Sequence, residues 1–153
     1  MSELEEYISN LEGLSNNLEE ILYATVKKNQ GKILTMVKLR LFNKGVDGSG
    51  SLISPKYAPD TIFRKKKKLL RTSHVTLRHS GKLYKSFIVE FKNNNIFIAT
   101  NVGYKQDLID QYGLDIFNLT LNEIRTILYS FFEPEIQKEL NKVQNIDLTD
   151  EVL

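Results

Sequence analysis

Two histidines, each next to a serine, are the first residues in this chain of 153 that could do chemistry. His74 follows Ser73, and His79 precedes Ser80, so each pair has the residue types of a nucleophile and its general base. Such a pair also needs an orienting carboxylate and a placed nucleophile, and no elbow motif surrounds either serine. Nearby cations disfavour a protonated imidazole. We therefore predict that both histidines are surface residues and that the protein is not an enzyme.

Three aspartates have the residue type of a metal site. Asp107 and Asp110 are three residues apart, which places them on one face of a helix, and Asp115 follows. Paired carboxylates bind Mg²⁺ or share acid–base chemistry. The alternative is a solvated helix face, with an acid near the N-terminus that offsets the helix dipole. We favour the solvated face and predict no metal, no cofactor and no catalytic residue.

Glycine, serine and proline are concentrated in residues 43–61. Residues 47–51 superficially resemble a calcium or phosphate loop, but they lack the acidic series of the first and the Gly-Lys-Ser/Thr ending of the second. A loop this long in a small domain usually has a function or is flexible. We expect a mobile surface loop, or an arm that becomes ordered only against a neighbouring molecule. Its assembly contacts would be Asp47, Gly48, Ser49, Gly50, Ser51 and Tyr57.

The sharpest charged feature is a run of five cations with a sixth close behind. It consists of Arg64, Lys65, Lys66, Lys67 and Lys68, followed by Arg71. We expect that this run cannot be buried. It could neutralise several phosphates without reading sequence, with a binding that weakens steeply in salt. A solvated helix face and a contact with an acidic protein surface are the alternatives, because no recognised nucleic-acid-binding pattern surrounds the run.

The net charge of +2 conceals a strong separation of charge along the chain. Residues 1–20 contain six acids and no base, whereas residues 56–92 contain eleven Lys or Arg and two acids. Such separation indicates electrostatic docking, either to nucleic acid or to an acidic protein surface.

The composition also excludes several classes of protein. The chain has no cysteine, so disulfides, thiolate chemistry and cysteine-based zinc sites are excluded. The acidic first residues lack the basic start and apolar run of a signal peptide. No stretch approaches the ~20 apolar residues of a membrane span. We expect a soluble protein, inside a cell or bound to a particle, with no membrane partner.

The hydrophobic periodicity predicts a single α+β domain over residues 1–142, followed by an acidic tail over residues 143–153. A long N-terminal helix is expected over residues 3–28, with residues 29–31 as its cap or as an interruption. A second helix over residues 33–42 is favoured over a strand. A basic helix would begin at Asp60 or Thr61, and its apolar contacts would be Phe63, Leu69 and Leu70.

The centre of the chain alternates like a β-hairpin, with residues 93–95, all Asn, as its tight turn. The scaffold residues would be Phe87, Val89, Phe91, Ile96 and Ile98. A short helical turn over residues 80–84 precedes the hairpin, and a helix over residues 105–112 follows it, capped by Gly113.

A capping box of Thr120 and Glu123 begins the last predicted helix. Pro134 would interrupt or kink this helix near Glu133. Its apolar face would be Leu121, Ile124, Ile127, Leu128, Phe131 and Phe132.

Three short motifs occur in an informative order. They are Leu77-Arg78-His79-Ser80-Gly81-Lys82-Leu83, then Phe87-Ile88-Val89, then Ile98-Ala99-Thr100-Asn101-Val102-Gly103-Tyr104. With Gln111-Tyr112-Gly113 and the approach to the last helix at residues 116–120, this order resembles the phage virion morphogenesis (tail completion) family over about residues 70–130. The chain departs from the family pattern at Val102-Gly103 and Lys105-Gln106, where the family usually has small residues at a helix start.

The resemblance implies a structural protein of the bacteriophage head–tail junction: a connector, neck-ring or tail-completion subunit that joins portal to tail. It implies a homo-oligomeric ring, portal, connector or tail proteins as partners, and a place in the virion after assembly in the host cytoplasm. It implies no catalytic residues. The basic strip of such a ring could line a channel that DNA traverses, with packaged DNA as a non-specific contact. The competing hypothesis is a small nucleic-acid-binding accessory protein that uses residues 64–71.

Overall fold

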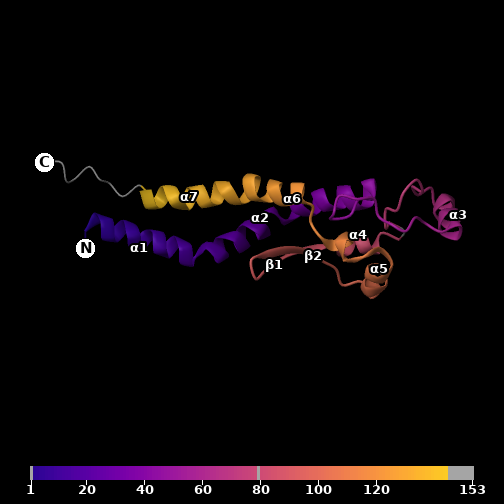
Figure 1. Ribbon diagram of the computed structural model, residues 1–153, viewed down its shortest axis with the longest axis horizontal. Coiled ribbons are helices and arrows are strands. Elements are labelled where there is room, and N and C mark those ends of the chain that lie inside the picture. Colours follow the sequence, from indigo (N-terminus) through magenta and orange to yellow (C-terminus); the bar gives the residue numbers. More distant parts are fainter. Residues whose placement is uncertain (1, 79, 145–153) are drawn as a thin grey trace.

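Long helices run along most of the length of this elongated molecule (Figure 1). The computed structural model describes residues 2–78 and 80–144. In Figure 1, α1 (Glu3–Asn16) and α7 (Glu133–Gln144) lie side by side at one end, and α3 (Pro59–Lys67) lies at the opposite end. A two-stranded antiparallel sheet packs against α2 (Leu18–Lys38). The α+β class predicted from the sequence is therefore confirmed.

The N-terminal helix breaks at a different place from the one predicted. Ser2 caps α1, since its Oγ accepts the Glu5 N–H at 3.2 Å and the Glu5 carboxylate accepts the Ser2 N–H at 2.8 Å. The break falls at Asn17, and α2 continues unbroken through Gly31. Nothing lies within 4 Å of the place where a Gly31 side chain would stand. Burial of Val26, Ile33 and Val37 on the other face outweighs the roughly 1 kcal/mol by which glycine weakens a helix.

The Gly/Ser/Pro loop packs against its own chain. After α2 the helix widens into a π-helical segment (Leu39–Lys44), which ends at Gly45 in the left-handed conformation. Gly48 donates its N–H to the Asp115 carbonyl at 2.8 Å, and Ile53 is 4% exposed within the core. The expectation of an arm that becomes ordered only against a neighbour is therefore wrong for this part of the loop. Helix α3 begins at Pro59 with Ala58 as its N-cap, so the caps expected at residues 60–61 are also wrong.

The predicted hairpin forms, but its turn is one residue shorter than expected, because Asn95 belongs to the second strand. Helix α4 (Lys82–Ser86) leads into β1 (Ile88–Lys92), which pairs antiparallel with β2 (Asn95–Ala99). Asn93 and Asn94 have φ of 52° and 59°, the two positive values that a tight type I′ turn requires. The expected scaffold residues face the interior: Phe87 and Ile98 are buried, and Val89, Phe91 and Ile96 are half-buried.

The C-terminal part follows the predicted order with a different helical period. Helix α5 (Lys105–Tyr112) ends at Gly113, and a 3₁₀ turn (Leu114–Phe117) follows. The capping box of Thr120 and Glu123 starts α6 (Leu121–Thr126), which continues through a π-helical segment (Ile127–Phe132) into α7. Pro134 has no N–H to donate to the preceding turn. The helix does not break there, because the preceding turn adopts the wider π-helical form. Residues 143–144 belong to α7, and residues 145–153 of the expected tail lie outside the described residues.

The π segment changes which side chains of the last helix are buried. Ile127 and Phe132 are five residues apart and are 1% and 7% exposed. Leu121, Ile124 and Leu128 were expected on the same apolar face, yet they are 40–62% exposed. Leu128 lies within the π segment, which does not keep the 3.6-residue period that the predicted face assumed, whereas Leu121 and Ile124 precede it in α6, where Glu123 is the buried residue.

Two adjoining apolar clusters form the core. The larger one joins α2, the loop, α4, the sheet and the 3₁₀ turn, and the smaller joins α2 to the last helix. Phe87 lies at the centre of the larger cluster, with ring centroids 5.2 Å from Phe42 and 5.9 Å from Phe117. Phe63 and Leu69, expected to seat the basic helix in this core, are instead 61% and 94% exposed.

A buried ion pair ties the two halves of the fold together. Arg40 Nε donates to Glu123 Oε1 at 2.7 Å, and both residues are less than a tenth exposed. The other guanidinium nitrogens donate to the carbonyls of Val46 at 2.8 Å and Asn118 at 2.9 Å. One arginine therefore joins α2's extension, the loop and the cap of α6.

Candidate anion-binding cleft

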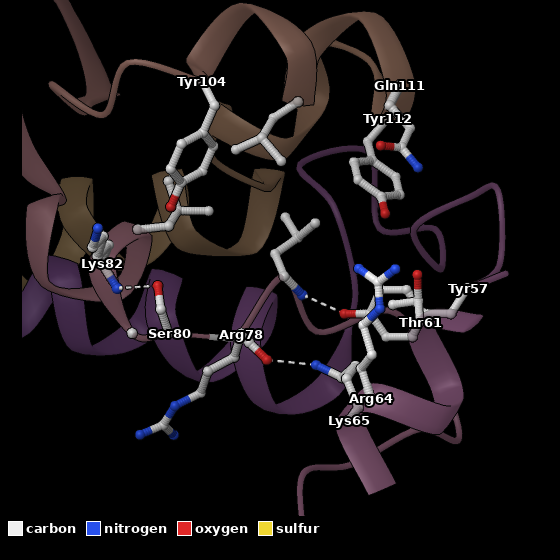
Figure 2. Close-up of a pocket in the computed structure, with 14 residues that line it drawn as sticks. Tyr57, Thr61, Arg64, Lys65, Arg78, Ser80, Lys82, Tyr104, Gln111 and Tyr112 are labelled. Carbon is white, nitrogen blue, oxygen red and sulfur yellow. Dashed lines mark hydrogen bonds between the residues drawn. The ribbon is translucent and has the colours of Figure 1, made fainter. Parts of the chain in front are cut away.

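A cleft of about 430 Å³ opens between α3, the segment that leads into α4, and α5 (Figure 2). Its volume falls within the range of about 300–1,000 Å³ that is usual for small-ligand sites. Four cationic residues, three tyrosines and an aliphatic floor line it. The lining residues are Tyr57, Thr61, Arg64, Lys65, Leu77, Arg78, Ser80, Gly81, Lys82, Leu83, Tyr104, Leu108, Gln111 and Tyr112.

Lys65 is the anchor of this cleft and not a solvated cation. Its side chain is 1% exposed, which corrects the expectation that the basic run cannot be buried. The ammonium donates to the Arg78 carbonyl, lies 3.5 Å from Thr76 Oγ1 and stands 4.8 Å from the centre of the Tyr57 ring. A buried charge is tolerated where hydrogen bonds and a π face replace its water.

Tyr57 lies on the same side of the cleft as Lys65 and holds the neighbouring backbone in place (Figure 2). Its hydroxyl accepts the backbone N–H of Thr76 at 2.9 Å and that of Leu77 at 3.0 Å. Leu77 has a φ of 54°, an unusual conformation that these two hydrogen bonds help to hold. Tyr57 was expected to contact a neighbouring molecule, but it braces the segment that carries Arg78.

Arg64 and Tyr112 face each other across the cleft. Figure 2 shows the guanidinium and the phenol hydroxyl pointing toward one another from α3 and α5. Burial raises the pKa of Tyr112 above its usual value, and the neighbouring Tyr57 adds to the rise. The Tyr112 phenol therefore stays neutral at physiological pH and can donate a hydrogen bond to an anion.

The remaining rim is polar and accessible. Lys82 has an exposed side chain, and its backbone N–H donates to Ser80 Oγ at 3.3 Å. Tyr104 is 38% exposed and lies on this same side of the cleft (Figure 2). The Arg78 guanidinium lies over the Tyr84 ring at 4.9 Å. Arg78 therefore contributes to the cleft through its backbone carbonyl, which accepts a hydrogen bond from Lys65.

The lining of the cleft has one sign of charge. None of the described residues that line it is acidic, and Leu77, Leu83 and Leu108 supply aliphatic surface between the cations. A concave surface with cations at its rim attracts anions and focuses their approach. The cleft is suited to an anionic group attached to an apolar one.

Other residues of the predicted basic site lie elsewhere. Lys66 and Lys67 are exposed outside the cleft, and Lys67 Nζ stands 4.6 Å from the Phe63 ring centre. Lys68 is also outside it. Arg71 Nη1 donates to the Asn43 carbonyl at 2.6 Å. The predicted basic site is therefore divided. Arg64 and Lys65 line the cleft, Lys66 and Lys67 lie on the surface outside it, and Arg71 makes a hydrogen bond within the chain.

The predicted assembly loop is held by its own hydrogen bonds. Asp47 Oδ1 accepts from the Ser49 N–H at 2.9 Å and from the Ser49 hydroxyl at 2.6 Å, and it lies 3.3 Å from the Ser51 N–H. Gly48 contacts the backbone of residues 115–118. Gly50 and Ser51 are exposed at the turn.

The described residues that were considered for catalysis or metal binding are exposed or hydrogen-bonded. His74 Nδ1 lies 2.9 Å from Ser73 Oγ and Nε2 lies 2.8 Å from the Asn43 carbonyl, so both ring nitrogens have partners. His79 lies outside the described residues. Asp107 and Asp110 are exposed on α5. Over residues 2–78 and 80–144, no three His, Asp or Glu side chains are grouped as metal ligands.

Sequence reasoning missed most of the cleft. Tyr104 and Tyr112 come from α5 and the residue before it, and Lys82 begins α4. These residues are scattered through the sequence, and only the fold gathers them. The one available signal was the excess of cations over residues 56–92.

Comparison of the chain with protein-family profiles, with curated proteins and with solved structures finds no match in any of the three. The resemblance of residues 70–130 to the phage family stays a prediction. In the described part of the chain, no helix combines the length and the apolar character needed to cross a membrane.

Proposed function

We propose that this protein is a structural subunit of a bacteriophage virion, one that forms a ring at the head–tail junction between portal and tail. Copies join head to tail, with the acidic end of one molecule against the basic end of the next. The protein would be made in the host cytoplasm and then incorporated into the particle, with portal, connector or tail proteins as its other neighbours.

The observation that carries this proposal is the separation of charge along the long axis. Helix α1 contains Glu3, Glu5, Glu6 and Glu12 and no basic residue, and it lies at one end of the molecule (Figure 1). Helix α3 carries its cations at the other end. Unlike surfaces that meet repeatedly make heterologous contacts, which close into rings when the rotation permits.

Exposed apolar side chains accompany the charges at both ends. Leu4 and Ile8 on α1 are 67% and 46% exposed. Phe63 and Leu69 at the α3 end are 61% and 94% exposed. Their burial would supply attraction that ion pairs at a surface do not give by themselves.

Charge exchange between the two ends tests the proposal. Glu3→Lys/Glu6→Lys/Glu12→Lys changes the charge of α1 from −4 to +2 without touching the Ser2–Glu5 cap, and Lys66→Glu/Lys67→Glu changes that of α3 from +3 to −1 outside the cleft. In low salt, sedimentation velocity should show multimers for the wild type and loss of multimers for each of these two variants. The chain that carries all five substitutions should assemble again. If that combined variant stays monomeric while the wild type assembles, the head-to-tail arrangement is wrong.

Location in the particle is tested separately. Electron microscopy of intact virions with this chain labelled should place the label at the head–tail junction. A label on the capsid surface or the absence of the chain from purified particles would contradict the structural role.

A nucleic-acid-binding accessory protein is the second candidate, favoured by the cationic cleft and by the exposed Lys66 and Lys67. It predicts DNA affinity that falls steeply with salt and disappears on replacement of these lysines. Multimers that persist after nuclease treatment favour the first candidate.

A further inference from the structure

We infer that the cationic cleft between α3 and α5 binds residues 145–153 of a second copy of the chain. The inference rests on the proposed head-to-tail assembly and names the contact that secures it. The occupant is a short acidic and aliphatic peptide segment.

The composition of this segment matches the lining of the cleft. Residues 145–153 include Asp147, Asp150 and Glu151 and no basic residue. Their apolar members are Ile146, Leu148, Val152 and Leu153. Carboxylates can pair with cations at the rim while aliphatic side chains cover the leucines of the floor.

Two cations are available for this pairing. Arg64 and Lys82 have exposed side chains on opposite sides of the cleft, whereas Lys65 is committed to the Arg78 carbonyl. Next to Arg64, the Tyr112 hydroxyl points toward the guanidinium (Figure 2). An extended peptide that crosses from Arg64 to Lys82 would pass over Leu77, Leu83 and Leu108.

The segment must come from another molecule, because it cannot reach the cleft of its own chain. The helix from Leu121 to Gln144 is about 36 Å long at roughly 1.5 Å per residue. Residues 145–153, even fully extended, span at most about 30 Å at ~3.3 Å per residue. The lining of the cleft comes from α3, α4, α5 and neighbouring segments, and these helices lie beyond the start of α6, further still from the end of α7 (Figure 1). In head-to-tail packing, the end that carries α7 approaches the end that carries α3.

A peptide is favoured over single-stranded nucleic acid by the floor of the cleft. The floor is aliphatic, and the Tyr57 hydroxyl already accepts two backbone N–H groups. Nucleic-acid sites stack successive bases on aromatic faces along a positively charged groove. Three tyrosines line this cleft, but the Tyr57 ring lies against the Lys65 ammonium, and Tyr104 and Tyr112 stand on opposite sides (Figure 2). Nucleic acid is therefore the competing outcome of the test.

Peptide binding in solution provides the test. The protein is the full chain with Asp147→Asn/Asp150→Asn/Glu151→Gln, which removes competition from its own segment. The probe is a fluorescein-labelled peptide of residues 145–153, followed by fluorescence anisotropy at low salt. Arg64→Gln/Lys82→Gln should weaken binding about tenfold or more. Lys66→Gln/Lys67→Gln makes the same change of charge outside the cleft and should weaken it less than about threefold.

A second peptide separates packing from charge. Replacing Leu148 and Val152 with Ser keeps every acid and should also weaken binding about tenfold or more. Equal denaturation midpoints for the two protein variants would show that Arg64 and Lys82 act on binding and not on folding.

Three results would overturn the inference. They are no binding of the native peptide, equal loss with both pairs of glutamine substitutions, or cleft-dependent binding of a ten-nucleotide thymidine strand in place of the peptide. The measurement needs no virion, so failure of the phage assignment leaves it intact. Conversely, failure of the peptide to bind would overturn only the inferred occupant of the cleft, because the charge-exchange experiment tests head-to-tail assembly independently.

Discussion

Removal of the Arg40 side chain should show how strongly one buried ion pair holds the fold. Arg40→Met keeps a long apolar chain but leaves the Glu123 carboxylate, 7% exposed, without its cation. The same carboxylate also accepts the Thr120 N–H at 2.9 Å, so the substitution perturbs the start of α6. The effect should therefore extend beyond the immediate contact.

The magnitude follows from the burial of both partners. Breaking one side of a buried ion pair destabilises a protein by about 3–5 kcal/mol. The carbonyls of Val46 and Asn118 also lose donors, but both residues are at least partly exposed and water can replace the arginine. We expect a loss of about 3–5 kcal/mol, a large part of the roughly 5–15 kcal/mol that stabilises an ordinary domain.

Urea denaturation followed by circular dichroism measures this loss. With a slope of about 2 kcal/mol/M, the midpoint should fall by about 2 M. Arg125→Met is the matched control, because this arginine is exposed on α6, and it should change stability by less than about 0.5 kcal/mol.

A double variant isolates the uncompensated charge. Arg40→Met/Glu123→Gln removes both charges and keeps an oxygen that can accept the Thr120 N–H. It should lose only about 1–2 kcal/mol, the size of an ordinary hydrogen-bond effect. If the single variant loses under about 1 kcal/mol, or the double variant loses as much as the single one, the reasoning about this buried charge is wrong.

Four further substitutions test other parts of the structure. Lys65→Met should destabilise by about 1–3 kcal/mol because the Arg78 carbonyl loses its donor, whereas the exposed Lys66→Met should stay within about 0.5 kcal/mol in the same urea assay. Gly31→Ala should stabilise by about 0.8–1.0 kcal/mol, since a Cβ there meets nothing within 4 Å. Gly48→Ala should destabilise by about 1–3 kcal/mol, because its Cβ would stand 2.7 Å from the Asn118 carbonyl oxygen, and a neutral result would contradict the close packing of the loop. Absorbance titration should contain a tyrosine component that ionises above pH 10 and is absent from Tyr112→Phe.

The sign of the pH effect follows from the Tyr112 shift. The folded-state pKa is raised above the model-compound value of 10.0, so the folded protein holds this proton more tightly than the unfolded chain. The corresponding stability is fully present below about pH 10 and is lost as pH rises through the folded pKa. Tyr112→Phe should reduce the fall in stability over that alkaline range.

Local signals predicted the parts of the fold that local chemistry determines. The turn at Asn93 and Asn94, the Thr120–Glu123 capping box and the C-cap at Gly113 were each identified from residue type and spacing. Each of these depends on hydrogen bonds or backbone conformations within a few residues. The predicted α+β class followed from their order.

Long-range packing determines the features that could not be predicted from the sequence, such as the continuity of α2 and the burial of Lys65. Residues 29–31 were expected to cap or interrupt a helix, but burial of Ile33 and Val37 keeps α2 continuous through them. Lys65 was grouped with four exposed cations, and its contacts with the Arg78 carbonyl, Thr76 and Tyr57 distinguish it from them. The candidate cleft depended on such contacts throughout, so the sequence predicted its charge but neither its walls nor its shape.

The wide turn over Ile127–Phe132 has a consequence for which changes of length the chain can accept. Each residue of an α-helix advances about 100° around the axis, so one residue removed from this turn would rotate all of α7 relative to α6. Glu135, now 3.1 Å from Lys28, would swing away from its partner, and Val143 would leave the interior. Substitutions that keep the size of side chains here should be tolerated in evolution far more readily than deletions.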